Sequence, residues 1–439
     1  MGLNQSKPDE QSVGAAPRRA ASAVLIEVFD RRKTLDEALN ACPEFFDLAG
    51  HDRAFARALA GEAIRRRGAL DFVIAQFLQK PLPDNASWAR AILRVGATEL
   101  LLLSTPAYAA VDAAVNLANA KARPFAKLIN AVLRRISERG EALLNATPAA
   151  QELPSWLWAR WRAAYGDDIA GKLARAHINQ PSLDLSIAQL ADSETWAERV
   201  GGKVMAPGCV RLPDGHADLT GLQGFAEGSW WVQDIAAAAP VRLLGDLRGK
   251  TALDLCAAPG GKTMQLAAAG AHVTAVDRSG KRLSIVRENL ERTHLAAEVI
   301  EADGAAFTSA DLFDAVLVDA PCSATGTLRR HPEAAWIKSD ADIVALQKTQ
   351  IRLLKNAIAL TKPGGVIIYC VCSLEPEEGP GIVAQILEQG SAVRDPIQVN
   401  EIEPFGAGVN TDGDLRIFPF VLDEQGGCDG FFATRLRRI

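Results

Sequence analysis

The stretch TALDLCAAPGGKT, residues 251–263, joins a short apolar run to a pair of glycines and a polar continuation. The run 251–256 predicts a short buried strand. Gly260 and Gly261 allow the backbone to turn sharply and to approach a ligand closely. A helix that begins behind them would direct its N-terminus at the same place, which favours an anionic group. The stretch therefore predicts a strand, a ligand-binding turn and a helix in succession.

The same alternation continues to the end of the chain. Buried strands are predicted at 272–277, 314–320 and 365–371, with amphipathic helices between them, such as 281–295. Strands that alternate with helices predict a parallel sheet covered on both faces, and ligands bind at the carboxyl ends of its strands. The segments expected along that edge are Asp254 to Gly261, Asp277, Asp303, Asp319 to Cys322, and Cys370 to Ser373.

The residues around the glycine turn restrict the ligand. A phosphate loop of the form G-x-x-x-x-G-K-T would need glycine at position 256, where the chain has Cys256, and the dinucleotide pattern G-x-G-x-x-G is absent. Asp277, at the end of the next strand, suits a ribose diol. A nucleoside without a phosphate chain, such as S-adenosylmethionine, fits both features. A glycine turn without a ligand is the alternative.

The N-terminal third has a different pattern. Apolar residues recur at three- and four-residue spacing in 88–103 and 126–136, and prolines separate the runs, which predicts an all-α domain of about six helices. The chain carries a net charge of −5, but residues 1–145 contain 20 Lys and Arg against 16 Asp and Glu, a net of +4. This bias leaves room for a polyanionic partner, although solvated helix faces would also explain it.

Length and composition predict a multidomain cytoplasmic protein, because 439 residues exceed the usual span of one core. We expect a disordered tail over 1–17, a helical domain over 18–145, a small α/β middle region over 146–240 and the parallel-sheet domain over 241–439. Seven scattered cysteines indicate a reducing compartment rather than a disulfide framework. No apolar stretch is long enough to predict a membrane span.

Three cysteines lie at the predicted ligand edge. IIYCVCSLEPEEG (367–379) ends a strand with Cys370 and Cys372, and VDAPCSATGTLRRHPEAAW (318–336) ends its neighbour with Asp319 and Cys322. A cysteine at a strand end is, taken alone, most often a packed small side chain. The spacing C-x-C without clustered histidines disfavours both a metal site and a redox pair, and no metal is expected. Two such cysteines beside an aspartate and a nucleoside site are hard to explain as packing.

Four segments together resemble the RNA cytosine-5 methyltransferase family: DLCAAPGGKT (254–263), DAPCSATGTLRRHP (319–332), VCSLEPEEG (371–379) and DGFFATRL (429–436). The helical N-terminal third resembles the NusB-like RNA-binding domain of the branch that acts on bacterial 16S ribosomal RNA, the Fmu/Sun group. The resemblance covers essentially the whole chain after the tail. It implies a Rossmann-like S-adenosylmethionine-dependent methyltransferase domain behind a NusB-like domain.

The resemblance also implies roles for individual residues. Cys372 would attack C6 of cytosine, which makes C5 nucleophilic, and Cys322 would assist release of the covalent enzyme–RNA adduct. Asp319 would hydrogen-bond the N3/N4 edge of the base, and Asp303 would contact the adenine side of the cofactor. The implied cofactor residues are Cys256, Ala257, Ala258, Pro259, Gly260, Gly261, Lys262, Asp277, Asp303 and Asp319.

Two positions depart from the family pattern. Val371 replaces the threonine before the nucleophile, so a hydroxyl role there is absent, and Cys370 replaces an alanine. Residues two apart on a strand share a face, so Cys370 lies on the side of Cys372 but deeper, and we interpret it as a packing residue.

The implied partner is small-subunit ribosomal RNA, with the target cytosine (967 in the family) extruded into the site of a monomeric enzyme. A transfer-RNA cytosine-5 methyltransferase and a non-catalytic RNA-binding factor are the alternatives.

Overall fold

The computed structural model describes residues 14–213 and 219–439, and it divides into two compact units. The first consists of Met1–Ile178 and His331–Lys338, and the second of Asn179–Arg330 and Ser339–Ile439. Of the predicted disordered tail, residues 1–13 lie outside the described residues, while helix α1 already begins at Ala15. The other domain bounds drawn from the sequence stay a prediction.

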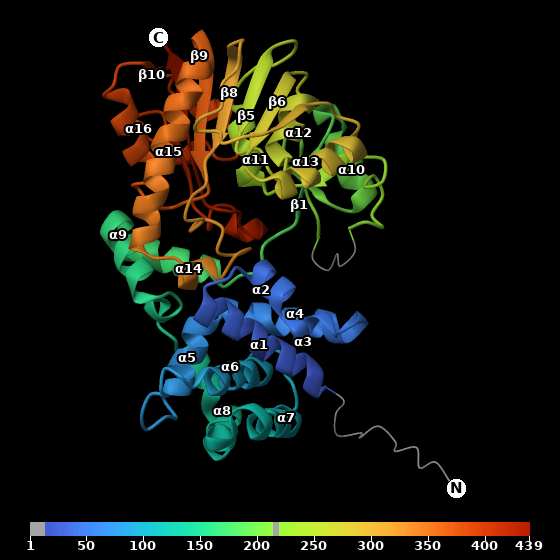
Figure 1. The fold of residues 1–439 in the computed structure, drawn as a ribbon, viewed down its shortest axis with the longest axis vertical. Helices are drawn as coiled ribbons and strands as arrows, with labels where there is room; N and C mark the ends of the chain where they lie inside the picture. Colours follow the sequence, from blue (N-terminus) through green and yellow to red (C-terminus); the bar gives the residue numbers. More distant parts are fainter. Residues whose placement is uncertain (1–13, 214–218) are drawn as a thin grey trace. The chain divides into compact units, whose positions relative to one another are not determined.

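The first unit is all-helical, as predicted (Figure 1). Its helices are α1 (Ala15–Arg31), α2 (Leu35–Ala41), α3 (Pro43–Phe46), α4 (Gly50–Arg65), α5 (Arg67–Ala75), α6 (Ser87–Leu101), α7 (Ala107–Lys121), α8 (Ala126–Asn145), α9 (Ser155–His177) and α14 (Ala334–Ile337). Helices α6 and α8 pack closely at Gly96, where an added Cβ would lie 2.7 Å from the Leu133 side chain. Helix α8 buries Ile129, Val132 and Leu133 against its neighbours, so its apolar stripe is the expected amphipathic face.

The segment His331–Lys338 joins this helical unit although it follows the predicted Cys322 loop in sequence. The Arg32 guanidinium donates to the Ile337 carbonyl from Nη2 at 2.6 Å and from Nε at 3.0 Å. The Arg67 guanidinium lies 4.3 Å from the Trp336 ring centre. Helix α14 is therefore held by α5 and by the residue that follows α1.

The second unit begins with a small antiparallel sheet in the order β2-β3-β1-β4. Its strands are β1 (Asp184–Ile187), β2 (Lys203–Ala206), β3 (Cys209–Arg211) and β4 (Trp230–Val232), and helix α10 (Ser193–Val200) precedes β2. A buried ion pair fixes it, because the Arg211 Nε donates to Asp184 Oδ1 at 2.6 Å.

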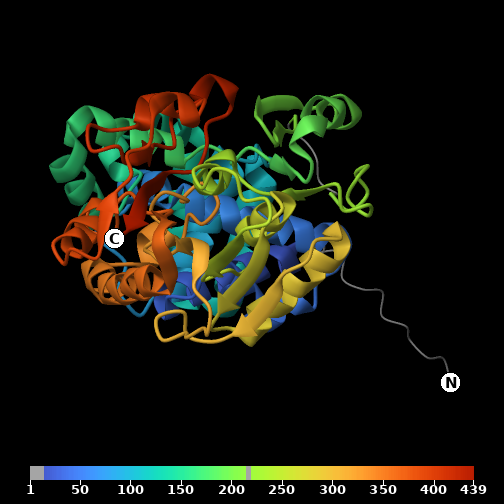
Figure 2. The same ribbon diagram turned by 90° about the horizontal axis from the view of Figure 1, so that it is seen from above.

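The larger sheet has the order β10-β12-β9-β8-β5-β6-β7, with β11 paired to β12 (Figures 1 and 2). Its strands are β5 (Thr251–Leu255), β6 (His272–Asp277), β7 (Glu298–Glu301), β8 (Phe313–Asp319), β9 (Thr361–Val371), β10 (Ala392–Arg394), β11 (Leu415–Ile417) and β12 (Phe431–Arg438). The pairings from β7 through β9 are parallel, and those of β10, β11 and β12 are antiparallel. The Rossmann-like fold class is confirmed, with an antiparallel edge added to the predicted parallel sheet.

Helices cover both faces of this sheet because its strands are apolar on both sides. Ile368 and Cys370 of β9 pack in the core that includes α11 (Ile235–Arg242) and α12 (Gly261–Ala268). Tyr369 packs on the other face with α15 (Asp340–Leu360) and α16 (Pro380–Leu387). Helix α13 (Gly280–Thr293) packs beside α12. The parallel strands thus direct their carboxyl ends to one edge, where the candidate residues follow them.

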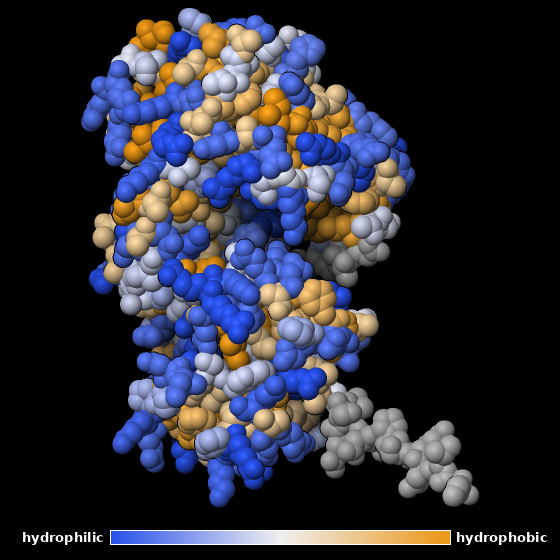
Figure 3. All heavy atoms as spheres, in the orientation of Figure 1, coloured by the Kyte–Doolittle hydropathy of each residue, from blue (hydrophilic) through white to orange (hydrophobic). Residues whose placement is uncertain are grey.

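Hydrophilic side chains cover much of the face drawn in Figure 3, interleaved with apolar ones. Among the helices in the described part of the chain, none is long and apolar enough to cross a membrane.

Candidate active site

The turn after β5 has the backbone of a ligand-binding loop. Cys256 has φ +67° and Gly260 has φ +105°, a left-handed conformation that glycine adopts without strain. An added Cβ at Gly260 would lie 3.3 Å from Val286 Cγ1 of α13, so the space behind the turn is filled. Helix α12 begins directly at Gly261, as predicted. The turn therefore lies at the carboxyl end of β5, with α13 packed against one side of it.

Asp277 ends β6 and supports this turn. Its Oδ2 accepts the Ala258 N–H at 3.2 Å, and its Oδ1 accepts the Ser279 N–H at 3.0 Å. Its side chain is only 3% exposed. Each carboxylate oxygen retains a second lone pair, so the group is able to accept further hydrogen bonds from a diol.

Asp254 is a fully buried acid on the strand below the turn. The Thr263 hydroxyl donates to its Oδ2 at 2.6 Å, while its Oδ1 has no hydrogen-bond partner among the described residues. Burial raises the pKa of Asp254 to about 7. Asp254 lies at the predicted edge, but its sequence position carries no signal of the raised pKa, which comes from burial.

Asp319, at the end of β8, lies between two side chains of the predicted site. The Lys262 ammonium donates to its Oδ2 at 2.8 Å, and the Cys370 thiol donates to its Oδ1 at 3.7 Å. Burial alone would lower the pKa of Lys262, but the neighbouring Asp319 carboxylate raises it above the usual lysine range. Lys262, predicted to contact the cofactor, is therefore also the counter-ion of the predicted base-binding aspartate.

The two predicted catalytic thiols lie side by side. Cys322 Sγ and Cys372 Sγ are 3.4 Å apart, and both residues are partly buried. The hydrogen bond to Cys372 and burial raise the pKa of Cys322 well above the usual thiol value. Cys370 is fully buried, and burial likewise raises the pKa of its thiol. The pair that the sequence predicted is thus brought together, and Cys370 is directed to Asp319 instead.

Two backbone hydrogen bonds tie the Cys322 loop to β9. The Ala320 N–H donates to the Cys370 carbonyl at 3.0 Å, and the Gly326 N–H donates to the Cys372 carbonyl at 2.9 Å. An added Cβ at Gly326 would lie 2.2 Å from the Gly430 carbonyl oxygen, so only glycine fits there. The loop that carries one thiol is therefore fastened to the chain that carries the other.

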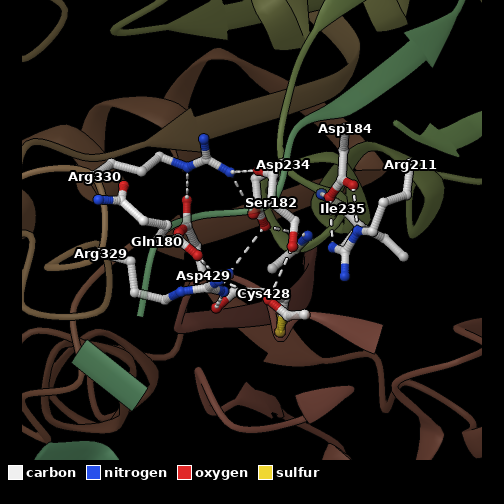
Figure 4. A network of polar contacts seen from close by, with 12 residues as sticks. Gln180, Ser182, Asp184, Arg211, Asp234, Ile235, Arg329, Arg330, Cys428 and Asp429 are labelled. Atoms are coloured by element: carbon white, nitrogen blue, oxygen red, sulfur yellow. Dashed lines mark hydrogen bonds and ion pairs between the residues drawn. The ribbon is translucent and has the colours of Figure 1, made fainter. Parts of the chain in front are cut away.

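A polar network holds the far end of the same loop (Figure 4). The Arg330 guanidinium donates to Asp429 Oδ2 and to Asp234 Oδ2, each at 2.8 Å. The Arg329 guanidinium donates to the Gly426 carbonyl at 2.6 Å. Burial and the nearby Asp234 raise the pKa of Asp429 to about 7. Arg329, Arg330 and Asp429 all stand in the quoted motifs, but no local pattern predicts that they form a network with Asp234.

Asp303 follows β7 and pairs with a residue outside the predicted site. Its carboxylate accepts the Ala305 N–H at 3.0 Å and forms an ion pair with Arg352 at 3.3 Å. It is exposed at the same carboxyl edge, because β7 and β6 are parallel neighbours. Its contact with an adenine ring stays a prediction.

Comparisons with known proteins identify the family to which the two parts of the chain are similar. A family model described as 16S rRNA methyltransferase RsmB/F matches residues 241–437, and a NusB family model matches residues 15–138. The ribosomal RNA small subunit methyltransferase B of Pseudomonas putida is 34% identical, over 96% of this chain and 98% of that protein. The protein of the same name from Pasteurella multocida is 33% identical, over 98% of each chain.

One solved structure covers nearly the whole fold. The crystal structure of PH0851 superposes with a TM-score of 0.75 and 22% identity, over 99% of this chain and 100% of that one. This superposition confirms the predicted fold class, and the two family models and the relatives of 33–34% identity confirm the family resemblance.

Proposed function

Because this chain belongs to the 16S rRNA methyltransferase RsmB/F family, we propose that it methylates C5 of a cytosine in small-subunit ribosomal RNA through a covalent bond between Cys372 and C6 of the base. The observation that carries the proposal is the pair of thiols 3.4 Å apart after the ends of β8 and β9, with Asp319 at the start of the loop that carries Cys322. A plain RNA-binding protein would have no use for that pair.

The two thiols suit different steps. Cys372 stands at the position of VCSLEPEEG where the family pattern has its nucleophile, so we assign to it the thiolate that adds to C6. Electron density then moves to C5, which takes the methyl group and afterwards loses its proton. As that C–H bond breaks, its electron pair restores the C5–C6 double bond and expels Cys372. Cys322, adjacent to the leaving sulfur, is placed to assist this last step.

Asp319 would contact the base and Lys262 would hold it there. The Lys262 ammonium already fixes one carboxyl oxygen of Asp319 at 2.8 Å. With its orientation set, Asp319 is able to accept from the N4 amino group, and the Lys262 ammonium beside it would balance the negative charge that develops at N3 as the thiolate adds.

The turn fits S-adenosylmethionine, which supplies a methyl group on a positively charged sulfur when bound. Burial and the negative charges of Asp277, Asp319 and Asp254 raise the pKa of the Cys256 thiol in this turn. Three carboxyl groups around one turn are a suitable environment for a cationic ligand. Asp277 would accept from the ribose hydroxyls, and Asp303 would lie toward the adenine.

The NusB-like unit and the small sheet would hold the RNA, and the target base would leave its stack to reach Cys372. The +4 balance of residues 1–145 supports phosphate contacts there. Both thiols, Asp319 and the cofactor turn come from one chain, so we infer that a monomer is sufficient.

The test uses purified protein with labelled S-adenosylmethionine and, separately, small-subunit ribosomal RNA and transfer RNA. We expect 5-methylcytosine at one position of the ribosomal RNA, located by bisulfite sequencing, with nucleotide 967 as the family's expectation. Label in transfer RNA alone would favour the transfer-RNA alternative. If the protein bound ribosomal RNA but transferred no label to ribosomal RNA or to transfer RNA, the result would favour the alternative of a non-catalytic RNA-binding factor.

A further inference from the structure

Glu378, six residues after Cys372, is a fully buried acid whose carboxyl group reaches both cysteine loops. Its Oε1 accepts the Ser323 N–H at 3.0 Å and the Gln350 amide at 3.0 Å. Its Oε2 accepts the Ser373 hydroxyl at 2.6 Å and also the Ser323 hydroxyl. All of these neighbours act as donors, which is the partner set that suits a carboxylate.

The two serines have a particular place in the sequence. Ser323 directly follows Cys322, and Ser373 directly follows Cys372. Both serines are fully buried, and their hydroxyl oxygens lie 3.0 Å apart. One carboxyl group therefore binds the residue next to each thiol, although the two thiols belong to loops that leave different strands.

Thr325 completes the cluster around the serines. Its Oγ1 accepts the Leu374 N–H at 3.0 Å, which adds a link between the two loops. Glu378 itself is anchored, because its backbone carbonyl accepts the Tyr369 hydroxyl of β9 at 2.6 Å. The position of the Glu378 carboxyl group is thus fixed, and both loops are hydrogen-bonded to it.

We propose that Glu378 is the positioning residue that sets the separation of Cys322 and Cys372, by holding Ser323 and Ser373 on one carboxyl group. The catalytic meaning of that separation rests on the proposed function, but the separation itself is measurable without RNA. Glu378 does not touch the reacting atoms and acts only through the two serines. In Glu378→Gln, the side-chain NH2 group would face the serine hydroxyls and the Ser323 N–H, which are themselves donors. The two loops would then lose their shared acceptor, and the distance between the two thiols would increase.

Phenylarsine oxide is a suitable probe of this distance. Its arsenic forms two As–S bonds with a pair of close thiols, and its oxygen leaves as water with the two thiol protons. We expect the wild-type protein to take up one equivalent, detected by intact mass, and Cys322→Ala and Cys372→Ala each to lose it. Those losses would place the reagent on this pair rather than on the other cysteines.

The deciding comparison uses Glu378→Gln with the exposed Glu388→Gln of the end of α16 as its matched control. We expect Glu378→Gln to weaken capture of the reagent at least tenfold and to slow adduct formation on 5-azacytidine RNA similarly. Glu388→Gln should match the wild type in both. Circular dichroism and thermal unfolding report whether each variant is folded.

Ser323→Ala and Ser373→Ala each remove one hydroxyl that donates to Glu378. They therefore test the positioning role of Glu378 if Glu378→Gln does not fold. Each should weaken capture several-fold while the protein stays folded. Wild-type capture by both serine variants, or by a folded but less stable Glu378→Gln, would assign Glu378 to folding alone and overturn the proposal. A wild-type protein that captures the reagent but methylates no RNA would overturn the proposed function and leave the positioning role intact.

Discussion

The cofactor turn (Cys256–Gly261 with Asp277) and the thiol pair (Cys322 with Cys372) are built in different ways. The turn is shaped by its own backbone and by the last residue of the neighbouring strand β6, as the Ala258–Asp277 hydrogen bond shows. The thiol pair depends on side chains that lie six or more residues along the chain from either thiol, chiefly Glu378 and Arg330. A site formed by one local turn can be predicted from a short sequence motif. A site formed by two loops cannot, because its geometry depends on contacts with residues elsewhere in the chain.

Apart from the loss of Cys372 itself, the largest effect is expected for Asp319→Asn, on the side of the thiol pair. The change weakens the ion pair with Lys262 and removes the charge that would face the base, so we expect kcat to fall about 100–1,000-fold. Single-turnover methyl transfer measures it, with the affinity for S-adenosylmethionine as a parallel readout. If Asp319→Asn instead weakened the binding of S-adenosylmethionine about 100–1,000-fold and left the rate of methyl transfer unchanged, Asp319 would belong to the cofactor site and not to the base site.

Asp254→Asn tests the turn through the pH dependence of stability. Burial raises the pKa of Asp254 from 3.8 to about 7, so its favourable contribution is complete below pH 4 and is lost as the pH rises through 7. The unfolding free energy of the wild type relative to Asp254→Asn should fall by about 2–4 kcal/mol over that range. Urea titrations at pH 4.5 to 8 measure this, and a pH-independent difference would contradict it.

Asp277→Ala affects the turn at the cofactor itself. The variant loses the group that supports Ala258 and would accept from the ribose, and it should bind S-adenosylmethionine more weakly by about 1–3 kcal/mol. Titration calorimetry gives the affinity. Unchanged binding would remove Asp277 from the cofactor site and leave it a support of the backbone only.

Cys370→Ala is the smallest expected change. The thiol is fully buried and donates a long 3.7 Å hydrogen bond to Asp319, so its loss should cost about 1 kcal/mol of stability and leave most activity. Thermal unfolding and methyl transfer are measured on the same preparation. A folded but inactive variant would mean that Cys370, not Cys372, is the essential cysteine of the CVC sequence.

The elements around both sites could be predicted because their patterns are local. The strand predicted at 272–277 coincides with β6, and the helix predicted at 281–295 is α13 with bounds shifted by one or two residues. The strand predicted at 365–371 ends where β9 ends but begins four residues later than β9 does. Apolar periodicity identifies such elements even where their first residue is polar.

The parts that sequence missed depend on contacts between distant residues. About six helices were expected in the first third, but the short helices α2 and α3 are too brief to show periodicity, and their signals are the Thr34 capping box and Pro43. No local sequence pattern predicts that His331–Lys338 packs with the helical unit. In the sequence, Glu378 is one of several acidic residues in a row. Nothing in that run predicts that its side chain contacts two serines.

The central claim is that Cys372 attacks the base and Cys322 acts afterwards, and one denaturing gel tests it. Labelled substrate RNA is incubated with S-adenosylmethionine and the wild type, Cys322→Ala or Cys372→Ala. We predict that Cys322→Ala accumulates a covalent protein–RNA complex that survives denaturation, whereas Cys372→Ala forms none and transfers no methyl group. A stable complex with Cys372→Ala and none with Cys322→Ala would contradict the assignment and exchange the roles of the two thiols.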